Sequence, residues 1–242
     1  MSCWLNYLVA TPLVGVAFRE DFFAPGIFSR AAEFVIENSK NDPDSEGLEF
    51  SVKDNATYSF DLKNGHEASL SLSGIIARFR YPLAIQQIDI LEYEKLVIEP
   101  RPYEDLLNEV VKQMEHYCAC VQKASDQTNI NVYRLGFVAL LETKRELLPP
   151  GLSARLDKLD PNNSLVALNH NEVIDLSADE ATIDRCHYSF YFDTAVKSDG
   201  ITVKLDWQRI WADNISIADV VDRISKVARA ALEHFEEVGA DV

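Results

Sequence analysis

Two segments decide the fold of this chain: LVGVAF at residues 13–18 and VYRLGFVAL at residues 132–140. Each is an apolar run rich in residues that favour strands. Each also opens the same order of predicted elements, namely a strand, a short helix, several strands and a long amphipathic helix. The sequence therefore predicts a tandem duplication, with residues 1–125 and 126–242 as two halves of one continuous domain.

In the first half, a short helix is predicted from Pro25, and alternating apolar residues predict strands between residues 48 and 72. Asn64-Gly65 is a strong hairpin signal between two of these strands. Further strands are predicted at 76–81 and 93–98. A long helix is predicted for 102–123, because apolar residues recur there every three or four positions.

In the second half, a short helix is predicted to end near Leu159, and two short strands between 165 and 176. Residues 186–193 alternate cleanly and predict another strand. The last strand is predicted at 201–207, and the last helix at 216–238, with Ser216 as its N-cap.

This element order predicts an α+β fold: a mostly antiparallel, curved sheet with the two long helices packed on one face. The order resembles the TATA-binding-protein-like, or helix-grip, arrangement, in which a long helix packs across a curved antiparallel sheet. That resemblance concerns topology, so it implies a fold and no function.

Two motifs carry a closer resemblance. Residues 101–106 read Arg-Pro-Tyr-Glu-Asp-Leu before the central helix, and residues 133–137 read Tyr-Arg-Leu-Gly-Phe at the start of the second half. They resemble the Pro-Tyr helix entry and the Arg-hydrophobic-Gly strand of a sporadically distributed family of uncharacterised prokaryotic proteins, over nearly the whole chain. The chain lacks the Trp that this family usually has early in the central helix. The family implies no activity; its patchy distribution resembles that of mobile or defence-associated genes.

The charge of the chain bears on its partners. It has 23 Lys and Arg against 39 Asp and Glu, a formal net charge of -16. Such a field repels nucleic-acid backbones and anionic lipid surfaces and attracts basic partners. We therefore expect a protein partner with a basic surface, and neither generic duplex nucleic acid nor a membrane.

The cysteines and the N-terminus indicate the cytoplasm. Cys3, Cys118, Cys120 and Cys186 form no regular framework, which favours a reducing compartment. Residues 1–18 carry no charge, but they lack the basic region and cleavage site of a signal peptide and are interrupted by polar residues. Acylation of Cys3 is the alternative; it lacks an adjacent basic patch as a second membrane signal.

No catalytic or cofactor motif is found in the sequence. It contains no Gly-x-Ser-x-Gly elbow, phosphate-binding loop or dinucleotide glycine cluster. His116 and Cys120 have the spacing to share a helix face, but two ligands do not make a metal site. We expect no metal and no cofactor, and the sequence favours a protein that is not an enzyme.

The candidate partner-binding residues are arginines and tryptophans. Arg78 and Arg80 alternate with aromatic residues, and Arg134 opens the equivalent strand of the second half. If the apolar faces of these strands meet the helices, the arginines lie on the open face, where a guanidinium can bind a carboxylate or phosphate through two hydrogen bonds. The alternative is that they pair with nearby acids. Trp207 and Trp211 flank the link to the last helix, as core residues or, if exposed, as an interface.

The leading hypothesis is a non-catalytic protein-interaction or regulatory module of a prokaryotic system, which the family resemblance associates with defence. A second hypothesis is a small-ligand binder or enzyme that uses a cavity between the sheet and the long helices, with His187 or Tyr191 in it. A third is nucleic-acid binding through the open sheet face, which requires a local basic stripe.

Overall fold

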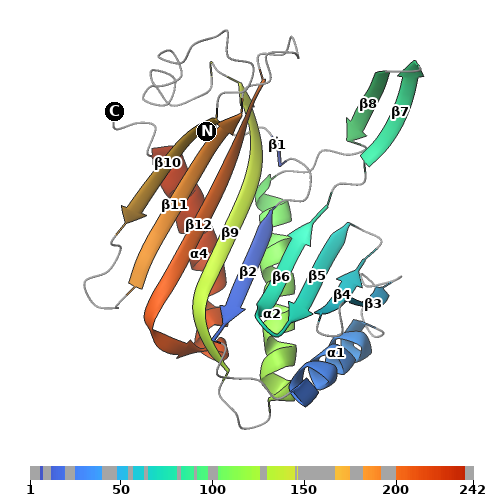
Figure 1. Ribbon diagram of the computed structural model, residues 1–242, viewed down its shortest axis with the longest axis vertical. Helices are drawn as coiled ribbons and strands as arrows, with labels where there is room; N and C mark the ends of the chain where they lie inside the picture. Colours follow the sequence, from blue (N-terminus) through green and yellow to red (C-terminus); the bar gives the residue numbers. More distant parts are fainter. Residues whose placement is uncertain are drawn as a thin grey trace.

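The computed structural model of the chain describes residues 6–7, 12–19, 25–39, 48–53, 57–62, 65–80, 83–89, 92–97, 103–125, 130–144, 146, 167–174, 182–191 and 200–237. In these residues, ten strands form one antiparallel sheet, which is visible across the centre of Figure 1. Its strands are β1 (Asn6–Tyr7), β2 (Leu13–Phe18), β3 (Glu49–Lys53), β4 (Thr57–Asp61), β5 (His66–Ser71), β6 (Gly74–Phe79), β9 (Asn131–Lys144), β10 (Ala167–Ile174), β11 (Thr182–Tyr191) and β12 (Gly200–Ser216).

Strands β2 and β9 lie side by side at the middle of this sheet. Outward from them, one half runs β2-β6-β5-β4-β3 and the other runs β9-β12-β11-β10, with β1 paired to β9 as well. In each half, therefore, the first long strand pairs with the last strand of the main sheet that precedes the long helix. A duplicated unit would give this order, but the duplication itself stays a prediction.

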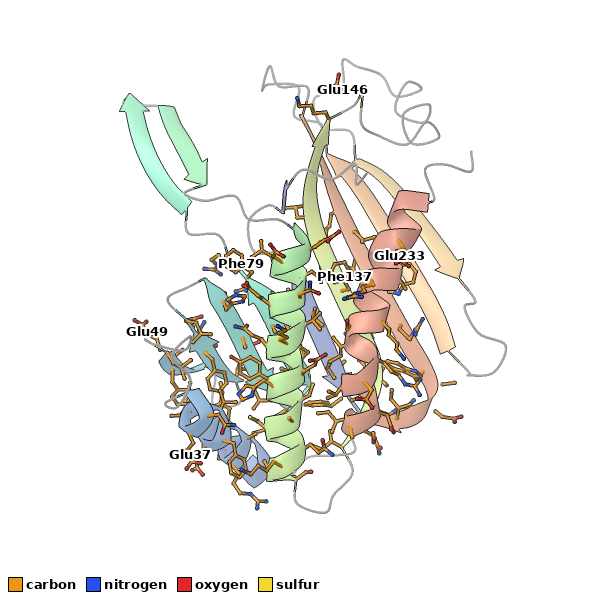
Figure 2. All side chains as sticks on the ribbon, turned by 180° about the vertical axis from the view of Figure 1, so that it is seen from behind. Glu37, Glu49, Phe79, Phe137, Glu146 and Glu233 are labelled. Atoms are coloured by element: carbon orange, nitrogen blue, oxygen red, sulfur yellow. The ribbon has the colours of Figure 1, made fainter. Side chains whose placement is uncertain are left out.

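Three helices are described, and the two long ones lie on the same face of the sheet. They are α1 (Pro25–Ser39), α2 (Tyr103–Ala124) and α4 (Ile217–Glu237). Helix α2 packs against β6 and β2, α4 packs against β9 and β12, and α1 packs against α2 and β5. Figure 2 shows α2 and α4 in front of the sheet, both on the face hidden in Figure 1. The predicted α+β class, the antiparallel sheet and the placement of both long helices are confirmed.

The core fills the space between these helices and the sheet. The apolar stripe of α2 is buried, and Met114 at its centre is fully covered. From the sheet, Phe137 of β9 and Trp207 of β12 are among the largest fully buried side chains, and Phe137 projects toward the helices (Figure 2). Periodicity alone identified the buried side of α2, because a period of 3.6 residues places these side chains on one face.

The start of α4 follows from its capping residue. Ser216 Oγ accepts a hydrogen bond from the backbone N–H of Asp219 at 3.1 Å and donates one to Asp219 Oδ2 at 2.6 Å. This arrangement satisfies an N–H group that would otherwise have no partner at the helix end, and the Asp219 carboxylate complements the helix dipole. The predicted N-cap is therefore confirmed.

Some elements differ from the prediction. Strand β12 continues to residue 216, past a register shift between Ile210 and Ile215, although the sequence predicted its end at 207. Strand β9 continues to Lys144. The strand predicted at 93–98 lies in a separate hairpin, formed by β7 (Leu83–Asp89) and β8 (Glu92–Val97), that does not join the main sheet (Figure 1).

The turn between β4 and β5 includes Gly65, whose φ of 93° is accessible mainly to glycine. The short helix predicted to end near Leu159 lies outside the described residues. Among the helices that the structure does describe, none combines the length and the apolar character that crossing a bilayer requires.

Candidate functional site

The face of the main sheet that looks toward the viewer in Figure 1 is the candidate functional site, because α2 and α4 run behind the sheet. Alternation along the central strands decides which side chains lie there. In β2, Val14, Val16 and Phe18 are buried beneath the helices. The residues between them, including Gly15 and Ala17, therefore lie on the other face, which we call the open face.

A pair of glycines lies at the centre of the open face. Gly15 of β2 and Gly136 of β9 are directly opposite one another in the antiparallel register. A Cβ atom at Gly136 would lie 3.9 Å from the carbonyl oxygens of Gly15 and Trp207, and one at Gly15 would have its nearest neighbour at 3.8 Å. These are ordinary van der Waals distances, and neither backbone has the left-handed conformation that favours glycine. The fold therefore does not require glycine at either position.

Gly74, at the start of β6, provides the contrast. Its φ is 156°, and a Cβ atom there would overlap the backbone carbonyl oxygen of Val16. This glycine is required by the approach of two strands. The glycines of the central pair instead leave space on the surface.

That space is a hollow of about 280 Å³ on the open face. Gly15, Ala17 and Gly136 contribute to it from the two central strands, and Ile76 of β6 borders it with 43% of its surface exposed. On the β12 side it is bordered by Asp206 and Gln208, and Arg134 of β9 also lines it. The hollow thus joins residues from both halves of the chain.

The polar side of the hollow is a short hydrogen-bonded chain. Arg134 Nη1 donates to Gln208 Oε1 at 3.4 Å, and Gln208 Nε2 donates to Asp206 Oδ1 at 3.2 Å. The guanidinium of Arg134 lies 5.6 Å from the centre of the Tyr133 ring, a cation–π distance. In the part of the chain that the structure describes, no carboxylate lies within ion-pair distance of Arg134. Its polar contact with the described residues is one long hydrogen bond to a neutral amide.

The other two arginines of the open face are held by one acid. Arg78 Nη2 lies 2.6 Å from Glu67 Oε2, and Arg80 Nε lies 2.8 Å from Glu67 Oε1. Glu67 belongs to the neighbouring strand β5, opposite Arg78 in the register. The structure therefore brings Arg78 and Arg80 together, with their charge partly neutralised. Arg134 is separate from them, beyond β2 and toward its other end, since Arg78 is opposite Leu13 and Arg134 is opposite Ala17.

Trp207 and Trp211 do not lie on this face, which corrects their assignment to a partner-binding surface. Their exposed fractions are 1% and 3%. Both belong to β12 rather than to a link before the last helix, and alternation with Asp206 and Gln208 places them under α4. Contact with a partner requires exposed rings, whereas both of these rings belong to the core.

His187 and Tyr191, the residues of the alternative ligand pocket, lie in β11. Their backbones are opposite Asp206 and Thr202 of β12. Their side chains lie outside the described part of the structure. A cavity between the sheet and the helices with these residues in it stays a prediction, and the hollow described above lies on the opposite face.

The two cysteines of α2, Cys118 and Cys120, are buried in the core. Burial raises the pKa of the Cys118 thiol well above its ordinary value, and burial also raises the pKa of Cys120. Cys120 Sγ lies 3.8 Å from His116 Nε2 and accepts a hydrogen bond from Asn38 Nδ2 at 3.6 Å. Within the described residues, no group of three or more His, Cys, Asp or Glu side chains is arranged to hold a metal ion.

Sequence reasoning missed the glycine pair and the Gln208–Asp206 part of the hollow. The available signal was a glycine inside each of the two predicted opening strands, where glycine is unfavourable without a reason. The register that pairs the two glycines is a tertiary property. No family model, curated protein or solved structure matches this chain. The geometry of the open face is therefore what bears on function.

Proposed function

We propose that this chain is a non-catalytic binding module that holds a protein partner on the open face of its sheet. The observation that carries the proposal is the hollow at the Gly15–Gly136 pair, lined by Arg134, which has no carboxylate partner among the described residues. The resemblance seen in the sequence adds that the partner belongs to a prokaryotic system associated with defence.

The glycine pair supports a use for the hollow. A glycine inside a strand lowers stability by about 0.5–1 kcal/mol relative to alanine. Here alanine would meet only ordinary contacts at both positions, so neither the backbone conformation nor the packing explains the glycines. Violations of a local rule without a structural reason concentrate at functional sites. Open space beside the backbone is what the two glycines provide.

Arg134 supports an acidic group as the occupant of the hollow. The chain carries a formal net charge of -16, so acids are abundant, and Glu67 binds both Arg78 and Arg80. Arg134 instead contacts a neutral amide at 3.4 Å. A guanidinium can form two parallel hydrogen bonds with a carboxylate. We therefore assign to Arg134 an Asp or Glu side chain of the partner.

The overall charge and the local charge have different roles in this proposal. The net charge of -16 attracts a partner with a basic surface over distances comparable to the Debye length. Arg134 then selects an acid within that surface at contact distance.

We place the protein in the cytoplasm, which the two free, buried cysteines Cys118 and Cys120 support.

Photo-crosslinking tests the proposal. A benzoylphenylalanine replaces Ile76, which is exposed beside the hollow, or Glu33, which is exposed on α1. After irradiation of cells of the native host, we expect a protein adduct from position 76 and not from position 33. Adducts from position 33 alone, or from neither position, would contradict the proposal.

The crosslinked partner then allows a charge-swap experiment at Arg134. We expect Arg134→Glu to weaken binding of the purified partner, and replacement of the contacting partner acid by Arg to restore it. A swap that restores nothing would show that Arg134 does not contact that acid.

The volume of the hollow favours one second candidate, a small carboxylate ligand. At about 280 Å³ it lies just below the range of roughly 300–1,000 Å³ that is typical of small-molecule sites. Titration with free succinate separates the two candidates. Saturable binding of succinate that Arg134→Gln abolishes would favour the small ligand, and its absence would favour a protein surface.

A further inference from the structure

Strand β3 is an edge of the main sheet. It pairs with β4 on one side, and on its other side no strand of the described part pairs with it. All five of its side chains are exposed, among them Phe50 at 41% and Val52 at 55%. An exposed edge strand with apolar side chains presents unpaired backbone groups and is able to pair with another strand.

The sequence of β3 is complementary to itself in the antiparallel direction. It reads Glu49, Phe50, Ser51, Val52 and Lys53, which is acidic, apolar, small polar, apolar and basic. If two copies pair antiparallel about Ser51, each Glu49 lies opposite Lys53 of the other copy, and each Phe50 lies opposite Val52. Directly opposite residues have Cβ atoms about 4.5–5.5 Å apart, so opposite charges and apolar pairs both stabilise this register.

We propose that β3 pairs with β3 of a second copy of this chain, across a two-fold axis at Ser51. A two-fold contact uses the same patch on both copies, which requires a self-complementary strand. The pattern of β3 meets this requirement with both its charged and its apolar positions. A different protein would not need such a pattern in β3.

The surroundings of Phe50 favour an ordered contact. Its ring is stacked on Tyr58 at 5.8 Å between centroids and lies 5.5 Å from the Phe60 ring. Val52 of the second copy would lie opposite Phe50 and add an apolar side chain to this cluster. The two-fold pairing also covers both β3 edges at once, so it closes the assembly instead of propagating it.

The dimer is expected to be weak. Five residues from each copy bury less than the roughly 1,200–2,000 Å² of a standard stable interface. Each copy also carries a formal net charge of -16, and their repulsion must be screened. The measurement therefore uses sedimentation velocity from about 1 µM to about 500 µM protein at an ionic strength of at least about 0.15 M.

Charge reversal tests the register. Glu49→Lys places like charges opposite each other twice, and so does Lys53→Glu. We expect each single variant to weaken self-association by at least about tenfold. The double variant Glu49→Lys/Lys53→Glu restores the opposite charges and should associate like the wild type. Glu33→Lys and Lys112→Glu are matched controls, because these residues are exposed on helices and change the net charge equally.

Three results would overturn the proposal: a wild-type protein that stays monomeric across the whole concentration range, single variants that associate like the wild type, or a double variant that associates no better than the singles. Glu49 and Lys53 lie at the β3 edge of the sheet and do not line the hollow at Arg134, so these variants leave the hollow unchanged. Loss of the β3 proposal would therefore not affect the proposed partner site, which crosslinking at Ile76 tests separately.

Discussion

Replacing Gly136 with alanine is expected to stabilise the protein by about 0.5–1 kcal/mol. The new Cβ atom would lie 3.9 Å from two carbonyl oxygens, so nothing must shift to admit it. The gain arises mainly because alanine has fewer backbone conformations to lose on folding. The same holds for Gly15→Ala, whose nearest contact would be 3.8 Å away. The two changes together should give about 1–2 kcal/mol.

Urea denaturation measures this gain directly. Both variants should raise the midpoint without changing the slope, and their melting temperatures should rise by about 2–4 °C per kcal/mol for a chain of this size. Gly74→Ala is the control of opposite sign: its φ of 156° and the overlap with the Val16 carbonyl oxygen should lower stability by at least about 1–3 kcal/mol.

A loss of stability in Gly136→Ala would refute this reasoning. Glycine would then be required by the sheet, and the hollow would be a by-product of strand packing. An unchanged midpoint would likewise remove the energetic argument that the open space has a use.

Three further predictions concern the core, the surface charge and nucleic acid. Met114→Asp should unfold the protein or lower its melting temperature severely, since it places a carboxylate at a fully buried position at a cost of several kcal/mol. Asn108→Asp, at an exposed position of the same helix, should change the melting temperature little. Burial, and then the charge of Asp222, raise the pKa of Glu115, so the folded state binds the proton more tightly and stability falls as pH rises through that pKa. Glu115→Gln should therefore stabilise the protein at about pH 7 and not at about pH 4, as measured by urea denaturation at both pH values. Generic duplex DNA should not bind at physiological salt in a gel-shift assay, and tight binding there would instead favour the nucleic-acid hypothesis.

The fold could be predicted where local patterns determine it. The apolar stripe of α2 and the Ser216 cap gave two long helices, and alternation in β6 placed Arg78 and Arg80 on one face of their strand. The ion pairs of these arginines could not be predicted, because Glu67 contacts them from the neighbouring strand and the register of β5 on β6 depends on the whole sheet.

The tryptophans show a different limit of sequence reasoning. Trp207 and Trp211 were placed at a link because β12 was predicted to end at residue 207, whereas it continues through a register shift to Ser216. Local propensity does not reveal such a continuation. Likewise, Gly15 and Gly136 are 121 positions apart in the sequence, and only the pairing of β2 with β9 makes them one feature.

The Kd of the crosslinked partner for Gly136→Val tests the central claim most directly. Valine has a high strand propensity, and at this position it adds a branched side chain that occupies part of the hollow. Gly26→Ala adds a methyl group to open space on α1 and serves as the control. We predict that Gly136→Val stays folded and binds at least about 30-fold more weakly, a loss of about 2 kcal/mol, while Gly26→Ala binds like the wild type. A folded Gly136→Val protein with the Kd of the wild type would contradict the assignment of the open face as the binding surface.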